Sequence, residues 1–211
     1  FNMSAQISTG NTNNSGTYSS AIGFQTSAAG DYSTAMGYNT TSSASYCTAM
    51  GYATTASGST STAMGVNTTA SGDGSTSLGN QTTASANNSI ATGASTTASG
   101  EVSTAMGYAT TANGSSSTSM GLSTTANGDA SIAMGLGTTA NGNVSVAMGR
   151  NTTASDYGSL VIGQYNYSGS AITTSSTAFN TSNTAFVIGN GTLGSLSDAF
   201  KVMFNGDATV S

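Results

Sequence analysis

The chain has 211 residues and a formal net charge of −5, with two basic residues, seven acidic residues and no histidine, proline or tryptophan. Phosphate contacts require Lys and Arg, so this composition argues against nucleic acid and against an anionic membrane surface as partners. Without histidine there is no Ser-His triad and no imidazole metal ligand, so we expect no enzyme activity, no cofactor and no metal site.

The first residues form a short lead-in. Residues 1–18 contain Gly10 and Gly16, which indicate degenerate half-repeats. Because the chain begins with Phe1 rather than Met, we expect a processed or partial polypeptide. No apolar run approaches the length of a membrane span, so we expect no membrane insertion by this segment.

Residues 19–163 form a fourteen-residue repeat, marked by a glycine that recurs without a slip. A fixed period held over this length is typical of a solenoid. The recurring glycines are Gly23, Gly37, Gly51, Gly65, Gly79, Gly93, Gly107, Gly121, Gly135, Gly149 and Gly163.

Within one repeat, residues 103–114, small residues alternate with variable ones, and two residues follow each glycine. Alternation with period two predicts a strand. The gap after glycine predicts a tight turn, since glycine adopts positive φ at little steric cost. One repeat therefore predicts two short strands and two turns, which together make one turn of an all-β solenoid.

Residue size predicts which side chains face inward. Every second residue along each strand is small, and these residues should point into a thin interior. In this repeat they are Ser103, Ala105, Gly107, Thr110, Ala112 and Gly114. Cys47 occupies the serine position of its repeat. We interpret it as a buried substitute for serine rather than a reactive thiol.

The outward-pointing positions of the first strand in each repeat predict an apolar outer face, here called the methionine ladder. Its members are Ile22, Met36, Met50, Met64, Leu78, Met106, Met120, Met134, Met148 and Ile162, with Thr92 as the exception. Burying one such side chain contributes roughly 1.5–3 kcal/mol, so the whole ladder should not stay exposed. We expect self-association with the ladder at a trimer axis, although this argument alone leaves a dimer open.

The second strand predicts a polar outer face, here called the threonine ladder. It comprises Thr41, Thr55, Thr69, Thr83, Thr97, Thr111, Thr125, Thr139 and Thr153, each followed two residues later by Ser or Asn. The simplest interpretation is a solvated face on which β-branched threonine favours strand. Contact with a glycan or host matrix, and ice binding through ordered hydroxyls, are the functional alternatives.

Two turn positions carry larger or charged side chains. One holds Phe24, Tyr38, Tyr52, Tyr108, Leu122 and Leu136, which either pack across subunits or are isolated surface residues. The other holds Asp31, Asp73, Glu101 and Asp129. The closest of these acids lie two coils apart, on the order of 10 Å, which is at or beyond the reach of a glycosidase pair, so we interpret them as solvated turn acids.

The repeat resembles the YadA-like head repeats of trimeric autotransporter adhesins. Both half-motifs, Ser-x-Ala-x-Gly-x-x and Thr-x-Ala-x-Gly-x-x, recur in register over residues 19–163. The resemblance implies a left-handed parallel β-roll, with three chains interlocked in an extracellular homotrimer. Thr104 and Met106 stand where the family usually has Val or Ile, and no neck motif, coiled-coil stalk or membrane anchor is recognised in this sequence.

Beyond the repeats the pattern changes. Residues 164–184 are a polar connector, and residues 185–211 are a β-rich C-terminal segment with strands expected at 185–189, 198–204 and 208–210. Asn205-Gly206 predicts a hairpin turn between the last two. Residues 187–191 and 198–206 resemble the segment that precedes an endosialidase-type intramolecular chaperone in phage tail fibres.

We therefore expect an extracellular, trimeric fibre or adhesin segment at a bacterial surface or on a virion. It would form a rigid projecting rod that can attach to a host surface, glycan or matrix. The alternatives are a virus or phage fibre, a purely structural extracellular filament and, less favoured, an ice-binding solenoid.

Overall fold

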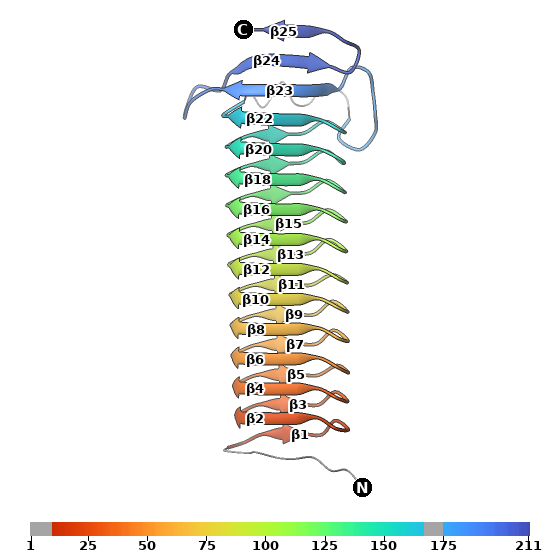
Figure 1. Ribbon diagram of the computed structural model, residues 1–211, viewed down its shortest axis with the longest axis vertical. Helices are drawn as coiled ribbons and strands as arrows, with labels where there is room; N and C mark the ends of the chain where they lie inside the picture. The colour runs from red at the N-terminus through yellow and green to blue at the C-terminus, as the bar shows by residue number, and fades with distance from the viewer. Residues whose placement is uncertain (1–9, 167–174) are drawn as a thin grey trace. The chain divides into compact units, whose positions relative to one another are not determined.

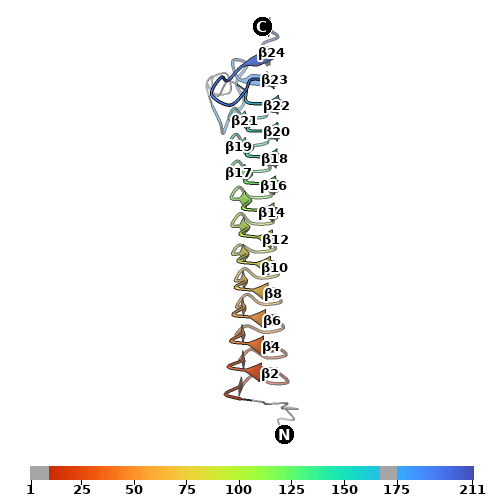
Figure 2. The same ribbon diagram turned by 90° about the vertical axis from the view of Figure 1, so that its left-hand side faces the viewer.

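The computed structural model describes residues 10–166 and 175–211. The chain divides into two compact units, Phe1–Val102 and Ser103–Ser211, which are taken in turn. Every regular element in the described residues is a β-strand, as the all-β prediction requires (Figures 1 and 2). No helix long and apolar enough to cross a membrane occurs in this described part of the chain.

The first unit alternates five-residue and two-residue strands. The longer ones are β2 (Ser20–Phe24), β4 (Thr34–Tyr38), β6 (Thr48–Tyr52), β8 (Thr62–Val66), β10 (Thr76–Asn80) and β12 (Ile90–Ala94). The shorter ones are β1 (Asn13–Asn14), β3 (Ser27–Ala28), β5 (Thr41–Ser42), β7 (Thr55–Ala56), β9 (Thr69–Ala70), β11 (Thr83–Ala84) and β13 (Thr97–Ala98). Strands of each kind stack in parallel one repeat apart, so Thr34 lies beside Thr48.

The second unit continues the same alternation. Its longer strands are β14 (Thr104–Tyr108), β16 (Thr118–Leu122), β18 (Ile132–Leu136), β20 (Val146–Arg150) and β22 (Leu160–Gln164). Its shorter strands are β15 (Thr111–Ala112), β17 (Thr125–Ala126), β19 (Thr139–Ala140) and β21 (Thr153–Ala154). Between them the two units contain about 11 solenoid turns, which confirms the parallel β-solenoid.

Three more strands close the second unit: β23 (Thr184–Asn190), β24 (Asp198–Met203) and β25 (Ala208–Val210). β23 pairs in parallel with β22, with Gly163 beside Gly189, so it repeats the register of the solenoid. β24 and β25 then add antiparallel strands, seen above β22 in Figure 1. The three strands expected near the C-terminus are therefore confirmed, while residues 1–9 of the lead-in and 167–174 of the connector lie outside the described residues.

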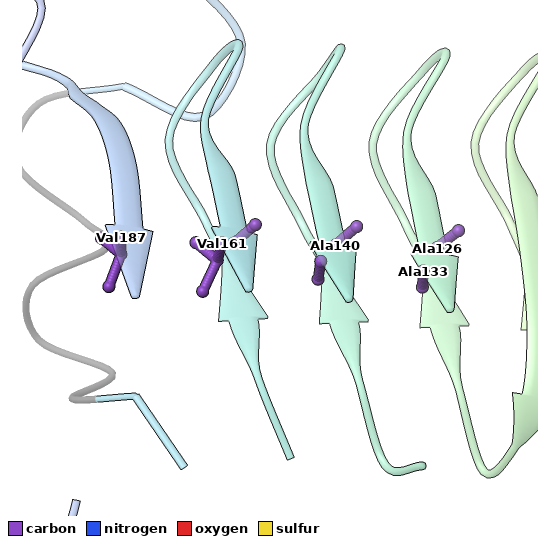
Figure 3. Packing of buried hydrophobic residues seen from close by; sticks show 7 residues of the cluster. Ala126, Ala133, Ala140, Val161 and Val187 are labelled. Atoms are coloured by element: carbon purple, nitrogen blue, oxygen red, sulfur yellow. The ribbon is translucent and has the colours of Figure 1, made fainter. Parts of the chain in front are cut away.

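The interior of each unit is as thin as residue size predicted. In the repeat at residues 103–114, Ser103, Ala105, Thr110, Ala112 and Gly114 are all buried. In the second unit the interior is a row of alanines that ends in Val161 and Val187, whose side chains lie in line with Ala126, Ala133 and Ala140 in Figure 3. Side chains this small let the two sheets approach closely, because protein interiors pack without voids.

The expectation that Gly107 also faces inward was wrong. Gly107 is half-buried and has φ +127, and a Cβ built there would lie 2.1 Å from the carbonyl oxygen of Gly121 in the next coil. Close stacking of successive coils therefore requires glycine at this position. The turns are where the sequence predicts them, but the left-handed residue is the second after each glycine, here Ala109 (φ 52) and Ser116 (φ 56).

One asparagine and one aspartate side chain bond to backbone groups where the repeats of the unit Ser103–Ser211 stop. The Asn166 amide takes the place of a further strand on β21, since its Nδ2 donates to the carbonyl of Thr153 (3.0 Å) and its Oδ1 accepts from the N–H of Thr153 (2.7 Å). Buried Asp156 accepts from the N–H of Thr184 at 2.7 Å. These bonds satisfy backbone groups that would otherwise be left open where the repeats stop.

Buried threonine hydroxyls give a test of the interior. The Thr68 hydroxyl is buried and has no hydrogen-bond partner among the described residues, whereas that of Thr82 lies 2.7 Å from the Ser77 hydroxyl. We expect Thr68→Val to raise the free energy of unfolding by about 1 kcal/mol, because a buried unpaired hydroxyl is destabilising. Thr82→Val should lower it by a similar amount, since the Ser77 hydroxyl loses its partner.

Chemical denaturation of the two valine variants, compared with the unchanged chain, measures both effects. The two substitutions are chemically identical, so opposite signs would isolate the hydrogen bond. Equal losses of stability in both variants would contradict this description of the interior.

Candidate interaction surfaces

The methionine ladder lies on the outward face of the five-residue strands. In the first unit, β-pairing places Met36 beside Met50 and Met64 beside Leu78. In the second unit, Met106, Met120 and Met134 follow one another in register. The ladder is partly exposed throughout: Met106 is 40% exposed, while its chain neighbour Ala105 is completely buried.

In the second unit the apolar face continues beyond the last repeat. The strand pairs place Ile162 beside Ile188, Ile188 beside Phe200, and Phe200 beside Val210. The sequence interpretation missed this extension of the ladder. The signal was present, because residues 161–164 (Val-Ile-Gly-Gln) and 187–190 (Val-Ile-Gly-Asn) are nearly the same repeat.

The outward face also carries two columns of stacked aromatic rings, both in the first unit. Phe24, Tyr38 and Tyr52 are the last residues of β2, β4 and β6, and neighbouring rings stack with centroids 5.5 and 5.2 Å apart. They are therefore neither turn residues nor isolated. A second column, Tyr18, Tyr32 and Tyr46, stacks at 5.2 and 5.0 Å and was not identified from the sequence.

The threonine ladder lies on the opposite outward face, at the first residue of each two-residue strand from β5 to β21. Each of its members is half-buried, and the residues two positions later are exposed except for buried Ser155. In the second unit three of these form an amide ladder, in which Asn113 donates to Asn127 and Asn127 to Asn141, each at 2.8 Å. This face therefore presents a regular array of hydroxyls and amides without charge.

Three of the four turn acids accept a hydrogen bond from the preceding coil. Asp31 accepts from the N–H of Thr17, and Asp73 accepts from the N–H of Ser59, both at 2.8 Å. Asp129 accepts from the N–H of Ser115 at 3.0 Å. Within the described ranges no three His, Cys, Asp or Glu side chains gather as they would around a metal ion. The geometry thus gives these carboxylates a part in joining coils.

Cys47 is buried, as its serine position predicted. Its Sγ lies 2.8 Å from the carbonyl oxygen of Ala44 and 3.1 Å from the Ser42 hydroxyl. The thiol therefore fills the place of the buried serine in its repeat.

Comparison with known families agrees with this arrangement. A family model described as the YadA head domain repeat matches more than half of the chain, at residues 15–40, 48–68, 70–96, 98–124, 112–138, 126–152 and 140–166. No curated protein matches the chain. YadA-like head repeats are a structural adhesin family and not an enzyme family. The matched repeats and the parallel β-solenoid together show that the chain belongs to the YadA head repeat family, an adhesin-type family of trimeric autotransporters.

Proposed function

We propose that this chain is an extracellular homotrimeric fibre or adhesin segment, in which the methionine ladders of three copies meet at the trimer axis. The observation that carries the proposal is the ladder itself. A long row of apolar side chains stays partly exposed, with Met106 at 40%, although full burial of such a side chain contributes roughly 1.5–3 kcal/mol. Membership of a trimeric adhesin-type family supports three copies as the cover.

In such a trimer the threonine ladder stays on the outside and carries any contact with a host glycan or matrix. Its residues offer the same weak polar groups in every coil, and three chains multiply them. Weak sites repeated along one assembly gain strength through avidity when the partner is also repetitive. A bacterial surface fits this role, and a phage fibre is the second candidate because of the resemblance carried by residues 187–191 and 198–206.

Deletion of whole repeats tests this distributed binding. Removing residues 107–134 takes out two complete repeats and rejoins Met106 to Gly135 in register. The fold should survive, because the stability of a solenoid is roughly a sum over neighbouring repeats. We expect a gradual fall in avidity for host cells or immobilised glycans, measured by surface-binding kinetics.

Removal of residues 107–133 provides the matched control, since it is one residue shorter and exchanges the inward and outward parities. It should abolish folding. Complete loss of binding by the in-register deletion, with the trimer intact, would point to one discrete binding site and contradict the proposal.

A further inference from the structure

The first unit concentrates exposed aromatic surface in three consecutive turns. The Tyr32 column consists of Tyr18, Tyr32 and Tyr46, and the Tyr38 column consists of Phe24, Tyr38 and Tyr52. All six rings are between 44% and 61% exposed, although each stacks on a neighbour in its own column. Both columns stop at the same turn, because Thr60 and Val66 occupy the next positions. Equal length and shared turns indicate that the two columns act together.

The two columns cannot contact each other within one chain. Tyr32 precedes β4 and Tyr38 is its last residue, so the two columns lie at opposite ends of the strands β2, β4 and β6, which Figure 1 shows stacked on one another. The five-residue strand β4 lies between them and separates them by roughly 15 Å. The methionine ladder runs between them, and the columns therefore flank the face that the proposed function assigns to the trimer axis.

When three such faces close into a ring, the side of one copy where the strands end lies next to the side of its neighbour where the strands begin. In a head-to-tail cyclic assembly, the strand ends on one side of each copy meet the strand starts on the other side of its neighbour. Resting on the proposed trimer, we propose that the Tyr32 column of one copy packs against the Tyr38 column of the next, forming an aromatic seam that is repeated three times. The occupant of each column is thus a second copy of this chain.

Area and ring geometry favour this occupant. An aromatic side chain has on the order of 150–250 Å² to bury, so three half-exposed rings per column leave roughly 300 Å² for a partner. The seam is therefore too small to act as a dimer interface alone and extends the contact made by the methionine ladder. A sugar would need free ring faces, but neighbouring rings in both columns stack on each other, with interplanar angles of 23° and 1° in the Tyr32 column and 16° and 5° in the Tyr38 column.

A double-mutant cycle tests the seam. Tyr32→Asn and Tyr38→Asn introduce residues that already occupy the matching positions in other turns, Asn88 and Asn80, so both variants should fold. Sites this far apart in one chain normally act independently. We expect each single variant to weaken the trimer, and the double variant to lose at least about tenfold less than the product of the two single losses, because each trimer has three aromatic contacts.

The matched control is Tyr32→Asn combined with Tyr108→Asn. Tyr108 is also an exposed strand-end tyrosine, but the same position in the preceding and following repeats holds Ala94 and Leu122 rather than an aromatic residue. Its effect should multiply with that of Tyr32→Asn. Trimer dissociation constants from mass photometry supply the fold-changes for both cycles.

Cross-linking adds a direct readout in a Cys47→Ser background. Tyr32→Cys and Tyr38→Cys together, treated with a short bismaleimide, should give covalent trimers on a denaturing gel, and each single variant should give none. Dimers from a single variant would mean that like columns meet, which overturns the seam. A trimer with neither coupling nor cross-links would overturn the seam and leave the proposed function standing, whereas a monomeric unmodified chain would overturn both.

Discussion

The Gly107→Ala variant should lose about 3–5 kcal/mol of stability, or fail to fold. Alanine at φ +127 is a strained backbone conformation, and its Cβ would lie 2.1 Å from the carbonyl oxygen of Gly121. Backbone strain and overpacking each cost roughly 1–3 kcal/mol, and here both apply. The obstacle is backbone, so no side-chain rotation relieves it. Thermal unfolding followed by circular dichroism measures the loss.

Gly158→Ala provides the matched control, because it is the same substitution at a positive φ in the same unit. Gly158 has φ +69, and the nearest atom to its built Cβ is 3.5 Å away on the Phe204 ring. Only the left-handed conformation is then penalised, at about 1–2 kcal/mol. Equal losses at Gly107 and Gly158 would show that close stacking of the coils is not what selects the repeated glycine.

Replacing Met106 and Met120 together by Asp should destroy the trimer. The two side chains are neighbours in the methionine ladder, on β14 and β16. In the proposed assembly they meet their counterparts from two other copies, so six carboxylates would be buried without cationic partners. Each such charge costs several kcal/mol or more. Native mass spectrometry should show monomer or unfolded chain.

The control for this experiment is Thr111 and Thr125 both changed to Asp, which adds the same charge to the threonine ladder of the same turns. Because that face stays outside the proposed trimer, the variant should remain trimeric. Dissociation by the threonine variant and not by the methionine variant would reverse the assignment of inner and outer faces.

The repeating part of the fold could be predicted because residue size alone decides it. Only a small side chain fits at Ala105, while Met106 at the next position has room outside. Inward-facing and outward-facing positions can therefore be told apart in the sequence. The turns follow from the glycines. What size did not reveal is that Gly107 is needed for contact with the next coil, since a missing side chain looks the same for an interior position as for a close approach.

Features that depend on contacts between distant residues could not be predicted from the pattern. The pairing of Gly163 with Gly189 crosses a long insertion that breaks the period. The Asn166 cap on β21 could be predicted only if β21 were known to be the last of the two-residue strands. The Tyr32 column lies at left-handed positions, as the φ values of Tyr32 (57) and Tyr46 (60) show. The residue type at this position varies widely between successive repeats, so the sequence pattern did not mark it.

Native mass spectrometry of the unmodified chain tests the central claim most directly. One chain has a mass of 20.5 kDa, and the account predicts a species of three times that mass that persists on dilution. Circular dichroism of the same sample should show β-structure. A folded, stable monomer of 20.5 kDa would contradict the account, because the methionine ladder would then remain exposed without a partner.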